Sequence, residues 1–131
     1  MAVPPEFLTL DDVREAQATG LAHFGGQAGE RDSGALEAAV MQPQASFDGE
    51  YLHEDIFSMA AAYGFHISEA QAFLDGNKRA AVLAMVIFLD LNGFRVREHE
   101  DILYLAMLDI VRGDLDKWGL AKLLRQLAGV S

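Results

Sequence analysis

The feature that most constrains the fold is an unbroken apolar run from Ala80 to Leu89. A helix over this run is apolar on every face, so other elements must cover it on every side. The run is too short to cross a bilayer, which needs about 20 apolar residues. It therefore predicts a helix at the centre of a helical bundle.

The rest of the chain carries the periodicity and caps of further helices, so the predicted fold class is all-α with about six helices. Thr9 and Asp12 match a capping box, and Asp32 or Ser33 can cap the second helix. Gln44–His53 predicts an exposed loop or a short hairpin, because it is polar and contains an Asp-Gly pair. The helices are expected from Thr9 to about Ala18, Ala35–Met41, about Glu54–Ala70, Asn77 or Lys78 to Asp90 or Leu91, Asp101–Val111 and Leu115–Leu127.

Two further expectations concern the segment after the first helix and the packing of the sixth helix. Gly20–Gly29 contains four glycines and predicts a loop, and the sixth helix is expected to turn Trp118 inward with its leucines. The third and fourth helices should form a buried helical hairpin that carries the functional site at its turn.

Length and charge limit the possible functions. The 131 residues make one domain, 1–131, and 51% hydrophobic residues argue against disorder. The chain has no cysteine and no signal-peptide pattern, which fits a cytoplasmic protein that is not bound to a membrane. A net charge of −10 argues against nucleic acid as a direct partner, because no basic stripe is present, and it permits a basic protein partner.

The segment Phe73–Arg79 interrupts the apolar pattern at the mouth of the central helix. From Asp32 to Phe94, Lys78 and Arg79 are the only lysine or arginine residues. Two isolated cations at a helix N-terminus oppose the helix dipole unless an anion lies beside them. The segment therefore predicts an anion site. The simpler alternative is that Asp75-Gly76 forms only a turn and a helix cap, with Lys78 and Arg79 exposed to solvent in the first helical turn.

The chemistry of this segment suits a metal-bound phosphate. Gly76 and the free N–H groups of the helix can cradle phosphate, and Asn77 can donate to it or hold the loop. Lys78 and Arg79 can pair with phosphate oxygens. Asp75 offers a hard oxygen ligand, and magnesium is usually held by one or two carboxylates together with phosphate oxygens.

The segment Gln71-Ala72-Phe73-Leu74-Asp75-Gly76-Asn77-Lys78-Arg79 resembles the core motif of the Fic/Doc family, His-x-Phe-x-Asp/Glu-Gly-Asn-x-Arg. The lysine at position 78 is similar to the Doc, or death-on-curing, branch of the family, whose motif ends Asn-Lys-Arg. The similarity extends along most of the chain and includes Phe24-Gly25-Gly26, Gln42-Pro43, Asn92-Gly93 and Gly113-x-Leu115.

The resemblance implies a Fic fold, ATP or another nucleotide with Mg²⁺, and transfer of phosphate or AMP to a hydroxyl of a target protein. It also implies a toxin that is restrained by an antitoxin and whose target is a translation factor, elongation factor Tu in the Doc branch. By the same resemblance, Asp75 holds the metal, Gly76, Asn77, Lys78 and Arg79 bind the nucleotide phosphates, and Gln44–His53 is a flap that receives a strand of the target.

One departure from the family pattern bears on catalysis. Gln71 stands where the resemblance puts a histidine as general base, and an amide does not take up a proton near neutral pH. We expect an impaired enzyme, or alternatively a catalytically silent module that binds nucleotide or a partner protein. On a continuous helix His66 cannot share the direction of Gln71 and is expected to be a packed, hydrogen-bonded histidine, and His53 is expected in the exposed loop.

Overall fold

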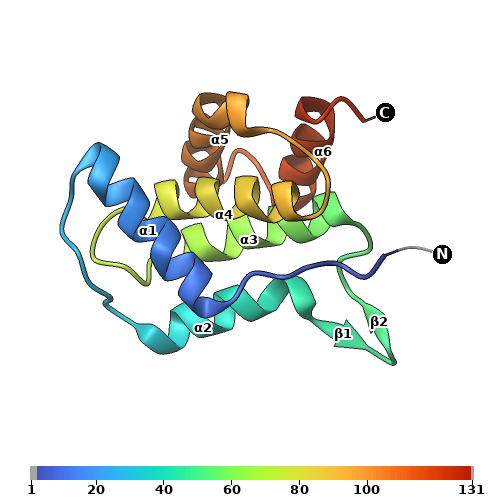
Figure 1. The fold of residues 1–131 in the computed structure, drawn as a ribbon, viewed down its shortest axis with the longest axis horizontal. Helices are drawn as coiled ribbons and strands as arrows, with labels where there is room; N and C mark the ends of the chain where they lie inside the picture. The colour runs from blue at the N-terminus through green and yellow to red at the C-terminus, as the bar shows by residue number, and fades with distance from the viewer. Residues whose placement is uncertain (1–2, 131) are drawn as a thin grey trace.

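The apolar helix of the sequence, α4 (Asn77–Leu91), lies in the middle of the fold beside α3 (Ile56–Ala70) (Figure 1). The computed structural model describes residues 3–130. The two helices run antiparallel, and most side chains of α4 are buried. This confirms the predicted helical hairpin. Among residues 3–130, no helix combines the length and the apolarity that crossing a membrane requires.

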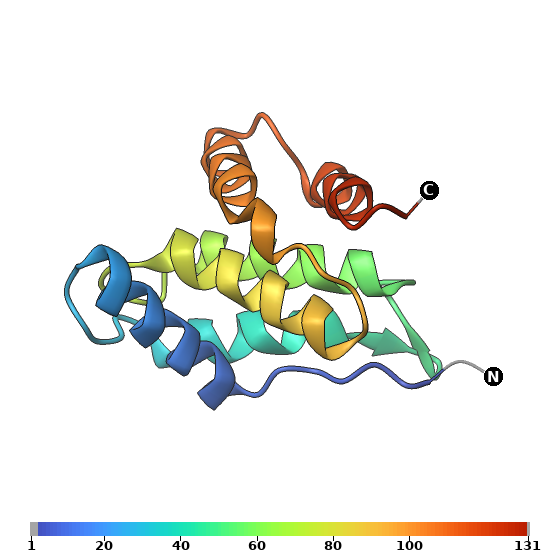
Figure 2. The ribbon, with the colours of Figure 1, turned by 45° about the horizontal axis from the view of Figure 1, so that its top comes forward.

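Further elements surround this pair in layers. Helices α1 and α2 lie on one side of it, and α5 and α6 lie on the other (Figure 2). These elements are α1 (Leu10–Phe24), α2 (Ser33–Met41), β1 (Ser46–Phe47), β2 (Glu50–Tyr51), α5 (Glu100–Arg112) and α6 (Lys117–Leu127), with 3₁₀ turns at Gln42–Gln44 and Arg97–His99. Within the described residues the fold is therefore all-α with six α-helices and one two-stranded hairpin, as predicted.

Helices α3 and α4 approach each other closely at Gly64. A Cβ at Gly64 would overlap with Sδ of Met85, so glycine permits this close approach. Tyr63 is fully buried on the same helix, and its hydroxyl accepts a 2.8 Å hydrogen bond from the backbone N–H of Leu8. Burial raises the pKa of Tyr63 to about 12. The N-terminal segment is thereby tied to the core, because an unpartnered buried hydroxyl would be costly.

Local caps form where the sequence places them. The side chain of Thr9 accepts from the N–H of Asp12 at 3.1 Å, and Asp12 Oδ2 accepts from the N–H of Thr9 at 2.8 Å. Asp32 caps α2 through a 3.0 Å bond from the N–H of Ala35. Ser46 pairs with Tyr51 across the hairpin turn. The capping box and the hairpin are confirmed.

Two expectations about the periphery were wrong. Helix α1 continues to Phe24 instead of ending near Ala18, and Gly20 lies inside it. A Cβ at Gly20 would lie 3.3 Å from Cβ of Arg79, so this glycine lets α1 approach α4. The side chain of Trp118 is 59% exposed instead of inward, because α6 packs through Leu120 and Leu124.

Candidate functional site

The motif loop, residues 71–76, connects α3 to α4 through two left-handed residues. Gln71 has φ 46° and ψ 42° at the end of α3, and Gly76 has φ 78° at the start of α4. Glycine adopts a positive φ without steric cost. A Cβ at Gly76 would meet the side chains of Leu21 and Gln17 only at 3.5 and 3.9 Å, which is ordinary contact. Gly76 therefore serves the backbone conformation of the turn.

The side chain of Asn77 closes this loop. Its Oδ1 accepts from the N–H of Phe73 at 3.0 Å, and its Nδ2 donates to the carbonyl of Phe73 at 3.1 Å. The ring of Phe73 is 1% exposed, so the loop is anchored in the core at the same residue. Of the two roles offered by the sequence, the side chain of Asn77 takes the one of holding the loop.

The connection between α1 and α2 lies along the motif loop (Figure 1). The N–H of Leu74 donates to the carbonyl of Gly29 at 3.0 Å, and the N–H of Gln27 donates to Oδ2 of Asp75 at 2.7 Å. A Cβ at Gly26 would lie 2.8 Å from Cδ2 of Leu21 and 3.1 Å from Cβ of Asp75, and Gly26 has φ 122°. This connection can run so close to the motif loop because glycine occupies that position.

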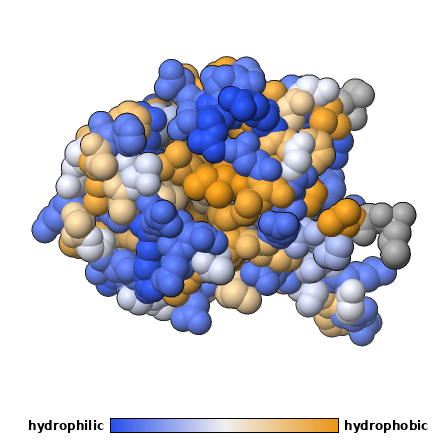
Figure 3. Space-filling model, in the orientation of Figure 1, coloured by the Kyte–Doolittle hydropathy of each residue, from blue (hydrophilic) through white to orange (hydrophobic). Residues whose placement is uncertain are grey.

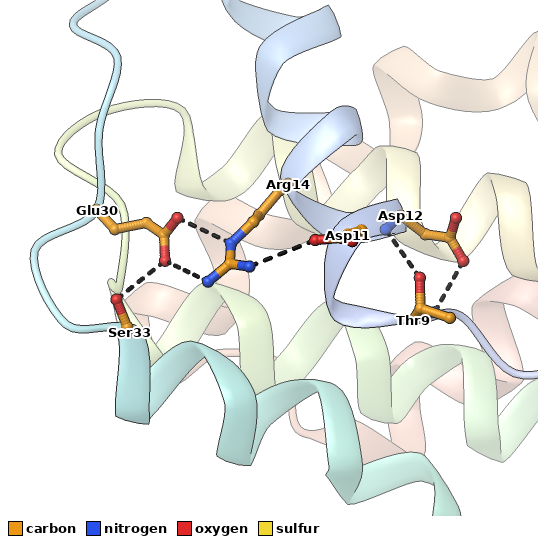
Figure 4. Close-up of polar contacts among 6 residues, drawn as sticks. All are labelled: Thr9, Asp11, Asp12, Arg14, Glu30 and Ser33. Atoms are coloured by element: carbon orange, nitrogen blue, oxygen red, sulfur yellow. Dashed lines mark hydrogen bonds and ion pairs between the residues drawn. The ribbon is translucent and has the colours of Figure 1, made fainter.

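An ion-pair network holds the same connection at its other end (Figure 4). Nε of Arg14 donates to Oε2 of Glu30 at 2.9 Å, and the hydroxyl of Ser33 donates to Oε1 of Glu30 at 3.2 Å. The hydrogen bond from Arg14 lowers the pKa of the Glu30 carboxyl. Glu30 also pairs with Phe73 in an antiparallel bridge. The network therefore couples α1 and α2 to the backbone of the motif loop.

The two predicted cations lie at the open N-terminus of α4. No side chain caps this helix, and its first N–H groups have no intrahelical partner. A cavity of about 190 Å³ opens there, lined by Leu74, Asp75, Gly76, Asn77, Lys78, Arg79 and Tyr104. The structure therefore brings the predicted phosphate ligands and the predicted metal ligand to one cavity.

The guanidinium of Arg79 is held between two aromatic rings. Its central carbon lies 3.8 Å from the centroid of the Phe24 ring and 3.9 Å from that of Tyr104. Sequence reasoning missed both rings, since Phe24 ends α1 and Tyr104 lies on α5, and no local pattern connects them to the motif. It likewise missed Gln17, whose side-chain amide donates to the carbonyl of Asp75 at 3.2 Å.

Gln71 is exposed at the end of α3, and no histidine is among the described residues that line the cavity. Nε2 of His66 lies 3.2 Å from Nζ of Lys117, and Nε2 of His53 lies 3.0 Å from it. The predicted hydrogen bonding of His66 is confirmed. The expectation of an exposed His53 was wrong, since its side chain is 4% exposed.

Burial governs the protonation of this second cluster. Burial and the nearby charge of Lys117 lower the pKa of His66 to about 4, and the same two causes lower the pKa of His53. Burial also lowers the pKa of Lys117. His53 and His66 both contact the amine of Lys117, and neither of them lines the motif cavity.

The hairpin lies at the opposite end of α3 from the motif loop in both ribbon views (Figures 1 and 2). The 15 residues of α3 separate them, which is roughly 20 Å along a helix at 1.5 Å per residue. The hairpin is present as predicted, but it does not lie over the cavity. The segment that does contact the motif loop is the connection between α1 and α2.

Comparison with known proteins identifies the family of the chain. The family described as "Fic/DOC family" matches residues 7–89. The chain is 37% identical over 97 residues to "Toxin Doc" of Mycolicibacterium smegmatis, an alignment that covers 74% of this chain and 72% of that protein. It is 29% identical over 126 residues to "Protein kinase doc" of Escherichia phage P1, covering 96% and 94% of the two chains. The chain belongs to the Fic/DOC family.

Proposed function

We propose that this chain is a Doc-type toxin that transfers a phosphate-containing group from a nucleotide to a hydroxyl of a target protein. The names of two relatives, a toxin Doc and a protein kinase doc, support this. The observation that carries the proposal is the uncapped N-terminus of α4, which opens on a cavity beside Lys78 and Arg79. Backbone N–H groups, the helix dipole and two cations all favour an anion at this place.

The residues of the cavity divide the work of binding a nucleoside triphosphate such as ATP. The backbone that starts at Gly76 and Asn77 offers N–H donors to phosphate oxygens. Lys78 supplies a compact positive charge, and Arg79 supplies a planar set of donors that fits two oxygens at once. The side chain of Asn77 acts indirectly, because its bonds to Phe73 hold these donors in place.

The site fits Mg²⁺ that is held mainly by the nucleotide. Asp75 is exposed beside the cavity, and its Oδ2 accepts from the N–H of Gln27. Among the residues that the structure describes, no group of three acidic or histidine side chains could hold a metal by itself. One carboxylate together with phosphate oxygens and water is the arrangement that Mg²⁺ accepts. Bound there, Mg²⁺ would offset negative charge on the phosphates.

Gln71 reduces the rate of the proposed reaction. The hydroxyl oxygen of the target forms a bond to phosphorus, and the bond from that phosphorus to the bridging oxygen breaks. ADP leaves when phosphate is transferred, and pyrophosphate leaves when AMP is transferred. The hydroxyl proton passes to water, since no imidazole lines the cavity. A general base contributes typically ~10²–10⁴-fold to such a reaction. Positioning and electrostatics supply much of phosphoryl-transfer catalysis, so slow turnover remains.

We propose an antitoxin as the partner that restrains this toxin. Apolar residues gather over α4 in the middle of one face (Figure 3). A groove of about 300 Å³ lies there, with Ala16, Leu83 and Ile87 in its lining and Asp12 and Arg97 also bordering it. An antitoxin helix with an apolar stripe fits such a groove. Ile87→Glu, which places a charge in the groove two helical turns away from Arg79, is then expected to abolish the complex while leaving ATP binding unchanged.

A second candidate function is a silent module that binds nucleotide or a partner protein without turnover. The absence of a histidine from the lining of the cavity favours it. Both candidates share the nucleotide site and the partner surface, and they differ only in whether a group is transferred.

The test is labelling of purified elongation factor Tu, the translation factor that the resemblance suggests as target, with ATP that carries ³²P at the α or the γ phosphate. Label from the γ position means phosphate transfer, and label from the α position means AMP transfer. We expect slow labelling by the wild type and faster labelling by Gln71→His, with Gln71→Asn as the matched control that stays slow. If the wild type labels as fast as Gln71→His, the role given to Gln71 is wrong. If Gln71→His labels no protein from either position, the transferase proposal fails.

A further inference from the structure

The setting of Arg79 is unusual for a cation on a protein surface. Its guanidinium carbon lies 3.8 Å from the centroid of the Phe24 ring and 3.9 Å from that of Tyr104, so two rings flank this one cation. The two rings belong to α1 and α5, while Arg79 belongs to the first turn of α4. Three elements far apart in the sequence therefore meet at this one side chain.

The sandwich leaves Arg79 one way to engage a ligand. With two rings packed against the guanidinium, a ligand engages it through the N–H groups along its edge, and these form a rigid fork. Within residues 3–130 the side chain of Arg79 makes neither an ion pair nor a hydrogen bond that would occupy the fork. Tyr104 lines the same cavity as Lys78 and the start of α4, so the arginine edge lies next to the other phosphate donors.

The exposure of Phe24 supports a role other than packing. This side chain is 60% exposed, although its apolar surface would normally favour burial. Its ring packs against the guanidinium of Arg79, at the end of a helix that Gly20 allows to approach α4. A ring held in this position gains little from burial and fixes the guanidinium by cation–π attraction.

We infer that Phe24 and Tyr104 are positioning residues that hold the edge of Arg79 toward the cavity, ready to bind two oxygens of one phosphate group. The inference rests on the proposed function, that the motif loop binds a nucleotide, and it adds the residues that set the affinity. Holding the guanidinium before the ligand arrives removes part of the ordering cost of binding. The ligand class is a nucleoside di- or triphosphate, or another oxyanion with two oxygens in one plane.

The experiment is calorimetric titration of the full chain with ATP and Mg²⁺ at fixed salt. Tyr104→Leu and Phe24→Leu are each expected to weaken binding about three- to tenfold, because a cation–π contact of this kind is lost. Tyr104→Phe keeps the ring and is the matched control, with binding expected within about twofold of the wild type.

A merely structural role is separated from positioning by a double-mutant cycle. We expect Tyr104→Leu to cost no further affinity in an Arg79→Leu background, because the ring acts only through the guanidinium. Thermal unfolding shows that each variant is folded at the titration temperature. Two results overturn the inference: an ATP affinity that is unchanged in Tyr104→Leu and Phe24→Leu, or a Tyr104→Leu loss of affinity that is equal in the wild type and in the Arg79→Leu background. Neither result contradicts the proposal that the motif loop binds a nucleotide. Failure of the folded wild type to bind ATP with Mg²⁺ overturns the proposed function and the inference together.

Discussion

Removing the side-chain amide of Asn77 tests whether the motif loop depends on that side chain. In Asn77→Ala, the N–H and the carbonyl of Phe73 each lose a partner at 3.0 and 3.1 Å, and both bonds are partly buried. A typical hydrogen bond contributes about 0.5–1.5 kcal/mol, and a buried group left without a partner costs about 1–3 kcal/mol. Because water can replace part of what is lost at this half-buried site, we expect the free energy of unfolding to fall by about 2–3 kcal/mol.

The assay is urea unfolding followed by circular dichroism, supported by thermal unfolding. At about 4 °C per kcal/mol for a chain of this size, the Tm should fall by roughly 8–12 °C. Asn77→Asp keeps an acceptor for the N–H of Phe73 and should lose about half as much stability.

Asn92→Ala is the matched control away from the motif. The side-chain amide of Asn92 also holds backbone groups, because it donates to the carbonyls of Glu6 and Phe88 at 3.0 and 2.8 Å. We expect Asn92→Ala to lose stability and keep ATP binding, while Asn77→Ala loses both. A stability loss below about 0.5 kcal/mol in Asn77→Ala would show that the loop is held by other contacts and would refute the reasoning.

Three further predictions address the metal, the half-buried His66 and the connection that lies along the motif loop. Asp75→Asn is expected to bind ATP equally well with and without Mg²⁺, whereas the wild type binds more tightly with it; calorimetry in Mg²⁺ and in EDTA checks this. His66 has a pKa of about 4 in the fold against an ordinary value of 6.5, so the unfolded chain takes up more protons as the pH falls through this window and stability decreases. After allowance for solvent screening we expect His66 to contribute a loss of about 1 kcal/mol at pH 5, so the loss should be smaller by this amount in His66→Gln, which keeps His53. Urea unfolding at pH 7 and pH 5 measures it, and an equal loss in both proteins contradicts it. Gly26→Ala should lose about 1–3 kcal/mol of stability, because its Cβ meets two side chains at a φ of 122°. Gly25→Ala, whose Cβ meets nothing within 4 Å, should lose less, and equal losses would argue against the close approach.

Local patterns predicted the parts of this fold that depend on local physics. The capping box of Thr9 and the apolar run of α4 each lie within a few residues of the structure that they specify. The end of α1 was misplaced because Gly20 reads as a helix breaker, whereas in the fold it makes room for Arg79. Trp118 was misplaced because α6 packs through other residues of its apolar stripe.

The candidate site likewise contains residues that the sequence predicts and residues that only tertiary packing brings to it. The motif loop is continuous in sequence, so the lining residues from Asp75 to Arg79 could be named, together with the replacement of a histidine by Gln71. Phe24 and Tyr104 could not, because their relation to Arg79 exists only after α1 and α5 have packed against α4. The pairing of His53 with Lys117 likewise joins segments 64 residues apart.

The central claim, that the phosphates of a nucleotide bind at the start of α4, is tested most directly by nuclear magnetic resonance. Spectra of the ¹⁵N-labelled wild type should be recorded while ATP and Mg²⁺ are added. The account predicts that the backbone amide signals of Gly76, Asn77, Lys78 and Arg79 shift first and furthest, because their N–H groups face the anion. Saturating ATP that leaves these four signals in place would contradict it. So would shifts confined to a second cavity between α2 and α3, which is lined by Ala35, Ala39, His66 and Ala70.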